Sequence, residues 1–335
     1  MKTHPSSQEF SSLVQGFFCE RLVDQQNVSP QTVAAYRDTF RLLLVFVSER
    51  QARAPSNLRL EDLDAALLNT FLDHLESQRG NCAKTRNNRL AALRAFFRFV
   101  SYEEPQCSLQ CQQVLAIPTK RYAKGSVEFL NEQETAALLG APDLSTWIGR
   151  RDRALLLVAV QTGLRNSELR ALRGGDVELG TGAYVRCMGK GRKTRCTPLR
   201  DDAVAVLQDW QAEQKRQADD PVFPSSRGGF LSPDALQSRV NRHVHSASTA
   251  CTSLQGRRIT PHTLRHTAAM TLLQHGVDLT VIALWLGHES IETTNQYLHA
   301  DMLLKERALG YGDPKGAPPT RFQPQDSLLA FLKAL

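Results

Sequence analysis

Helical periodicity dominates the first hundred residues of the chain, and no stretch before residue 105 alternates as a β-strand does. Ser29 followed by Pro30 is a helix-start signal, because serine can cap a first turn and proline loses no hydrogen bond there. Three apolar stripes have helical spacing: Val33, Tyr36, Phe40, Leu43 and Val47; Leu63, Leu67, Phe71 and Leu75; Leu90, Leu93, Phe97 and Val100. The pattern predicts a helical module.

This periodicity breaks at residues 105–127, PQCSLQCQQVLAIPTKRYAKGSV, which contain two prolines. The break predicts a linker. We therefore expect a helical domain at 1–108, a basic linker at 109–127, a second domain at 128–310, and a further linker with a short amphipathic helix at 311–335.

The second domain contains clear start and stop signals. Asn131 with Glu134 predicts a capping box, and an apolar helix from Trp147 should end at Gly163.

Two β-prone runs follow, at 184–188 and 193–199, and the Gly-Lys-Gly turn between them predicts a hairpin with Lys190 at its tip. Beyond it we expect helix through Leu309, with Gly276 as a stop and Asp278 as the next cap. The fold class is therefore mainly α with a small β-hairpin, the second domain being α+β.

The chain has 335 residues, of which 41 % are hydrophobic, enough for two cores. It contains no run long enough to span a membrane, and its N-terminus lacks the apolar segment of a signal peptide, so we expect a cytoplasmic protein. Seven irregularly spaced cysteines should be reduced thiols, and Cys107 and Cys111 lack the second pair that a metal site needs.

A basic stretch lies between Glu76 and Glu103, where no acidic residue occurs. With a net charge of +7, the stretch is either a solvated basic face or a surface that contacts DNA phosphates. The predicted DNA contacts are Lys84, Arg86, Arg89 and Arg94 here, and Lys120, Arg121 and Lys124 in the linker.

Five short motifs hold residues suited to phosphate chemistry: TGLRNSEL, GKGRKTRCTPL, TPHTLRHT, LGH and NQYLH. Cutting a DNA strand by transesterification needs a nucleophile, cations at the phosphate and a proton donor for the leaving oxygen. Guanidinium groups suit the second task because they pair bidentately with phosphate oxygens. Each motif alone would be unremarkable, but their joint occurrence is hard to obtain by chance.

In these motifs, their order and their gaps, the chain resembles the phage integrase family of tyrosine recombinases, and its Xer-type members in layout. The resemblance covers about residues 162–299. It implies a helical core-binding domain joined to an α+β catalytic domain. It also implies that Arg165 and Arg265 clamp the scissile phosphate and that Tyr297 attacks it.

The same resemblance makes Lys190 the general acid and His262 a general acid/base. It makes His288 a phosphate ligand and Glu168 a supporting residue. No cofactor and no metal are implied. Other polar residues nearby are expected to be ordinary surface or helix residues: His243, His245, His266, His275, His299, Lys193 and Arg195, although Lys193 and Arg195 could touch backbone phosphate.

The expected function is site-specific recombination of double-stranded DNA through a 3′-phosphotyrosine, in a homotetramer whose C-terminal helices dock on neighbouring protomers. The cysteine content and the extended tail favour a mobile-element enzyme. Two alternatives stay open: a DNA-binding relative without catalysis, and a type IB topoisomerase.

Overall fold

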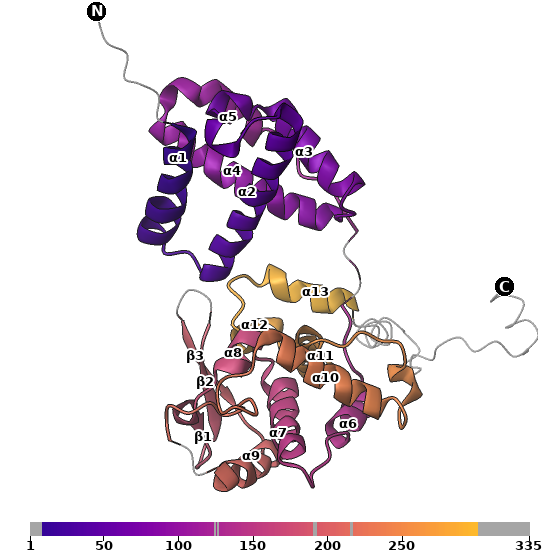
Figure 1. The fold of residues 1–335 in the computed structure, drawn as a ribbon. Helices are drawn as coiled ribbons and strands as arrows, with labels where there is room; N and C mark the ends of the chain where they lie inside the picture. Colours follow the sequence, from indigo (N-terminus) through magenta and orange to yellow (C-terminus); the bar gives the residue numbers. More distant parts are fainter. Residues whose placement is uncertain (1–8, 124, 126, 190–192, 215–216, 301–335) are drawn as a thin grey trace, which may run out of the picture. The chain divides into compact units, whose positions relative to one another are not determined.

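The chain forms two units, Met1–Lys124 and Gly125–Leu335, each with its own core (Figure 1). The computed structural model describes residues 9–123, 125, 127–189, 193–214 and 217–300. The predicted C-terminal helix and the tip residue Lys190 lie outside these residues, as does Lys124.

The described part of the first unit is helical throughout. Its elements are α1 (Phe10–Gly16), a π-helix (Phe17–Gln25), α2 (Pro30–Gln51), α3 (Ala65–Ser77), α4 (Ala83–Glu103) and α5 (Ser108–Leu115), with 3-10 turns at Pro55–Asn57, Leu60–Asp62 and Pro105–Cys107. The Ser29 hydroxyl caps α2 by accepting from the Thr32 N–H, as predicted. Phe17 packs against Phe40 and Phe96 in the core between the long helices α2 and α4.

The prediction of a linker from residue 109 is wrong for the stretch that forms α5. Cys111 and Val114 are buried in the core of the first unit, and Ile117 closes the same cluster. Cys107, Cys111 and Val114 have helical spacing, which appears only when cysteine is counted as a small apolar residue. The core of the first unit therefore extends to Ile117.

The second unit combines helices with one small sheet. Its elements are α6 (Glu132–Gly140), α7 (Trp147–Thr162), α8 (Asn166–Ala171), β1 (Val177–Glu178), β2 (Tyr184–Met188), β3 (Thr194–Pro198), α9 (Asp201–Gln214), α10 (Pro233–Ala247), α11 (Pro261–Gln274), α12 (Leu279–Leu286) and α13 (Glu292–Ala300), with 3-10 turns at Gly174–Asp176 and Thr252–Leu254. The strands are antiparallel in the order β1-β2-β3, and the predicted hairpin is the β2–β3 pair.

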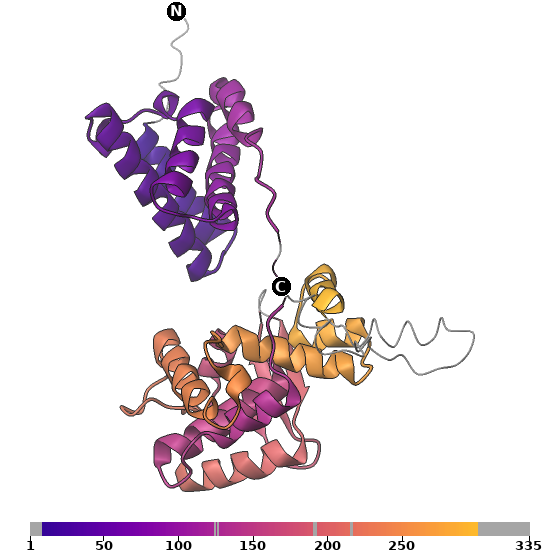
Figure 2. The same cartoon turned by 90° about the vertical axis from the view of Figure 1, so that its right-hand side faces the viewer.

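Helix α7 is the centre of the second unit. Most of its side chains are buried, and α6, α9 and α11 all pack against it (Figure 2). The Asn131–Glu134 capping box and the Asp278 cap of α12 form as predicted. The sheet lies at one edge of this unit, beside α8 (Figure 1).

The expectation of helix through Leu309 is wrong for residues 217–232 and 248–260, which form no α-helix, and residues 301–309 lie outside the described part of the chain. The first of these stretches has isolated bridges, Arg173 with Pro221 and Pro224 with Phe230. Pro221, Pro224 and the pair Gly228–Gly229 explain the interruption, because both residue types oppose helix.

No helix in the described part of the chain is long and apolar enough to cross a membrane.

Candidate active site

The candidate site is built around two glycine turns. Gly163 ends α7 with a φ of 62°, and Gly287 ends α12 with a φ of 65°. A Cβ on Gly163 would lie 2.6 Å from the Leu286 side chain, and one on Gly287 would lie 2.9 Å from the Arg195 guanidinium. Both positions therefore need glycine for backbone conformation and for close approach.

Arg165 begins α8 immediately after the first turn. Its N–H donates to Glu168 Oε2 at 2.7 Å, which closes the capping box. Its guanidinium donates to Glu168 Oε1 at 2.8 Å and to the Gly287 carbonyl at 2.7 Å. The side chain is 30 % exposed, so the anchored guanidinium still reaches solvent.

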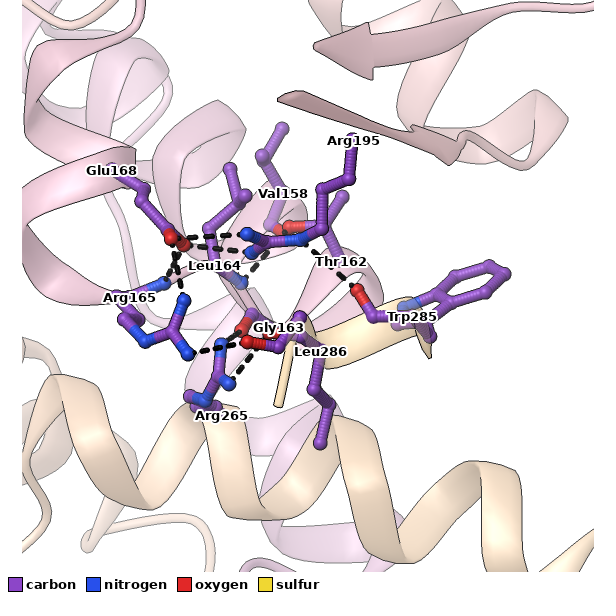
Figure 3. A network of polar contacts seen from close by, with 11 residues as sticks. Val158, Thr162, Gly163, Leu164, Arg165, Glu168, Arg195, Arg265, Trp285 and Leu286 are labelled. Carbon is purple, nitrogen blue, oxygen red and sulfur yellow. Dashed lines mark hydrogen bonds and ion pairs between the residues drawn. The ribbon is translucent and has the colours of Figure 1, made fainter. Parts of the chain in front are cut away.

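Arg265 comes from α11 and is held by the same two turns. It donates to the Gly163 carbonyl at 2.6 Å and to the Leu286 carbonyl at 2.7 Å (Figure 3). Burial, then the nearby charge of Arg165, lowers its pKa to about 10, so it stays a cation at neutral pH. The structure thus brings together the two arginines that the motifs singled out, although 100 residues separate them.

Arg195, expected to be an ordinary residue, is built into the site. Its guanidinium donates to both oxygens of Glu168, at 3.0 and 2.7 Å, and its Nε donates to the Trp285 carbonyl at 3.2 Å (Figure 3). One signal could have shown this. Arg195 pairs with Cys187, and Cys187 and Val185 are buried, so strand alternation places Arg195 on the inner face.

Glu168 therefore joins two cations within the protein interior. Burial by itself raises its pKa, but hydrogen bonds from the Arg195 guanidinium and the Arg165 backbone outweigh it and hold the pKa at about 2. Because the folded pKa lies below the usual 4.5, the carboxylate stabilises the fold above about pH 4.5 and loses that contribution as the pH falls toward 2.

We expect Glu168→Gln to remove this part of the pH dependence. The shift corresponds to about 3 kcal/mol of unfolding free energy at pH 7, absent from the variant. All three tryptophans lie in the second unit, so urea unfolding followed by their fluorescence reports on that unit. As the pH is lowered from 4.5 to 3, the unfolding free energy of native protein should fall more than that of the variant. Parallel pH profiles for the two proteins would contradict the lowered pKa of Glu168.

Tyr297 lies on α13 and is fully buried. Its Oη is 3.0 Å from Nδ1 of His266, which was expected to be ordinary. The predicted general acid/base His262 is exposed on the same helix, its ring centroid 4.2 Å from that of His266. The imidazole that contacts the phenol is thus the one directly after Arg265; its place inside the motif TPHTLRHT was the available signal.

His288 lies parallel to Tyr297, with the ring centroids 6.5 Å apart. Its Nδ1 lies 2.8 Å from the Thr294 hydroxyl. Burial, followed by the charges of Arg265 and Arg165, lowers the pKa of His288 to about 4. The ring is therefore neutral near pH 7 and can serve as a hydrogen-bond donor to a phosphate.

The predicted general acid Lys190 lies outside the described residues, but β2 and β3 on either side of it are paired. The Gly189 N–H donates to the Lys193 carbonyl at 2.9 Å, so the pairing extends to these two residues. Arg195 on β3 ties this hairpin to Glu168, and thus to Arg165.

The predicted DNA contacts in the first unit divide into two groups. Arg86 is only 3 % exposed and donates to the Pro118 carbonyl at 2.8 Å, so its prediction as a phosphate contact is wrong. Arg89 and Arg94, both half-buried, donate to the carbonyls of Ala35 and Ile117. The packing of the first unit brings these carbonyl groups next to the arginines, and the guanidinium groups donate hydrogen bonds to them. The sequence alone does not show these neighbours.

The other basic residues stay candidates for DNA contact. Lys84 and Arg121 are exposed. Lys120 is exposed as well, but its ammonium lies 2.6 Å from Glu76, so that a phosphate would have to compete with a carboxylate.

The sequence of the chain is similar to those of known proteins. Residues 128–303 match the model of the phage integrase family, and residues 16–104 match the phage integrase N-terminal SAM-like domain. The chain is 51 % identical, over 96 % of its length and 97 % of the relative, to "Putative integrase/recombinase y4rC" of Sinorhizobium fredii. It is 32 % identical, over 89 % of its length and 96 % of the relative, to tyrosine recombinase XerD of Pseudomonas putida.

A solved structure shares the fold. The XerH site-specific recombinase, in a post-cleavage complex with its palindromic difH substrate, aligns with a TM-score of 0.69 and 23 % identity, covering 86 % of this chain and 82 % of that one.

Proposed function

Because the chain belongs to the phage integrase family, we propose that it is a site-specific DNA recombinase that cuts and rejoins strands through a 3′-phosphotyrosine on Tyr297. The observation that carries the proposal is the convergence of two guanidinium groups on one pair of turns. Arg165 and Arg265 are bonded to the neighbouring carbonyls of Gly287 and Leu286, and Tyr297 follows on the next helix.

The chemistry follows from these groups. The phenol oxygen attacks phosphorus, the Oη–P bond forms and the bond from phosphorus to the 5′-oxygen breaks. Arg165 and Arg265 neutralise the negative charge that develops on the non-bridging oxygens. Lys190 supplies the proton to the departing 5′-oxygen, and an imidazole takes the proton of the phenol. The ester conserves the energy of the bond, so that rejoining requires neither ATP nor a metal.

The proposed partners are double-stranded DNA sites and three further copies of the chain. Exchange between two duplexes needs four strand cleavages, and each protomer carries one copy of Tyr297, which argues for a tetramer. The first unit would hold DNA through exposed cations such as Lys84 and Arg121, and the enzyme would act in the cytoplasm.

The experiment uses nicked duplexes tiled across the DNA that flanks the gene. A nick close to the cut site releases a short fragment and traps the covalent adduct. We expect an adduct that survives denaturation, with the DNA phosphate mapped to the Tyr297 peptide by mass spectrometry. Binding without any adduct would favour the non-catalytic alternative, and relaxation of a plasmid that lacks the site would favour a topoisomerase.

A further inference from the structure

The phenol of Tyr297 meets a histidine that the five motifs did not assign. His266 lies on α11 directly after Arg265, and its Nδ1 is 3.0 Å from the phenol oxygen. The two rings are in an edge-to-face arrangement with centroids 5.6 Å apart. His266 is half-buried, whereas His262 is exposed, so His266 is the imidazole packed between α11 and α13.

The phenol is buried, and its pKa reflects the groups around it. Burial raises the pKa of Tyr297, whereas the charge of Arg265 and a hydrogen bond with the Gln296 side chain lower it. A protonated phenol can donate its hydrogen to an imidazole nitrogen that carries a lone pair, and proton transfer to the ring requires this direction.

The state of the imidazole fits this direction. Burial, followed by the charges of His262 and Arg265, lowers the pKa of His266 to about 4, so the ring is neutral near pH 7. With its proton on Nε2, Nδ1 carries a lone pair directed at the phenol. A DNA phosphate bound by Arg265 would offset the positive field of that arginine and raise the proton affinity of the ring during the reaction.

We propose that His266 accepts the proton of the Tyr297 phenol during strand cleavage, the task first expected of His262. This inference rests on the proposed recombinase function. As the Oη–P bond forms, the phenolic proton passes to Nδ1 of His266, and the 5′-oxygen leaves with a proton from Lys190. In religation the 5′-hydroxyl gives its proton to Lys190 as its oxygen attacks phosphorus, the Oη–P bond breaks, and His266 returns its proton to the departing phenolate.

The test measures single-turnover cleavage of the nicked duplex by two variants. His266→Phe removes both nitrogens, and His266→Asn keeps an acceptor near the position of Nδ1 that cannot take up a proton. We expect both to cleave about 10²-fold more slowly than native protein. The matched control is His275→Phe, an exposed histidine beyond the end of the same helix, which should cleave at the native rate.

Two chemical substitutions separate proton transfer from simple packing. A ring-fluorinated tyrosine at position 297 has a more acidic phenol and should restore cleavage by His266→Phe about tenfold or more. A duplex with sulfur at the bridging 5′ position needs no proton for its leaving group, so it should not restore this variant.

Several outcomes would overturn the inference. These are cleavage by His266→Phe at the native rate, rescue of that variant by the sulfur leaving group, and no rescue by the fluorinated tyrosine. Faster cleavage by His266→Phe would also overturn it, because the hydrogen bond from the phenol to His266 would then slow the attack of the phenol on phosphorus. If native protein forms no adduct, the recombinase proposal itself fails, and the two failures are distinguishable.

Discussion

Tyr297→Phe is expected to abolish the covalent adduct while leaving DNA affinity within about threefold of the native value. In the proposed mechanism the phenol oxygen is the attacking group, and the substitution removes that oxygen alone. Phenylalanine fills the same buried space on α13, so the main structural loss is the hydrogen bond to His266. That loss should cost about 1 kcal/mol of unfolding free energy.

The measurement is the amount of covalent adduct trapped on the nicked duplex, together with a binding assay on the same duplex. Tyr184→Phe is the matched control, because it deletes the same hydroxyl from a half-buried tyrosine on β2. The control should form the adduct at the native rate. An adduct formed by Tyr297→Phe at that rate would place the nucleophile elsewhere and remove the basis of the proposed mechanism.

Arg265→Ala is expected to slow single-turnover cleavage by about 10³-fold. The variant leaves the Gly163 and Leu286 carbonyls without their donor, and in the proposed mechanism it also loses a cation at the phosphate. Arg265→Lys keeps a charge but has no planar fork to reach both carbonyls and a phosphate, so we expect a loss of about 10²-fold. The lysine variant also keeps the experiment informative if the alanine variant is unstable.

The matched control is Arg150→Ala. Arg150 lies on α7 in the same unit and pairs with Glu213 at 2.8 Å, with 38 % of its side chain exposed. Its removal should leave the cleavage rate within about threefold of native and cost less than about 1 kcal/mol. Cleavage by Arg265→Ala at a rate like that of this control would show that the buried guanidinium does not act on the phosphate.

A series of ion pairs connects Arg195 on β3 to Arg165 at the start of α8. Arg195 holds both oxygens of Glu168, Glu168 holds Arg165, and Arg165 bonds to the Gly287 carbonyl. Removing one partner of such a buried ion pair leaves a charge uncompensated. A change at Arg195 should therefore alter the position of the Arg165 guanidinium, which the proposed mechanism places at the phosphate.

Sequence alone was sufficient where the physical cause is local. The Ser29 cap, the Asn131–Glu134 capping box and the Gly163 stop each act within a few residues, and all form as predicted. The reactive side-chain types were visible too, because phosphate chemistry needs a nucleophile and cations wherever they stand in the chain. The same local view failed at α5, where a cysteine stands for an apolar core residue.

Tertiary structure decided the partners. Glu168 and Arg195 are 27 residues apart, His266 and Tyr297 are 31 apart, and Arg165 reaches a carbonyl 122 residues away. Arg86 could be taken for a surface cation until the packed first unit placed the Pro118 carbonyl beside it. Helical and strand spacing are set by neighbours along the backbone, whereas the neighbour of a buried charge is set by how whole elements pack, and charges without a nearby partner are too costly to bury.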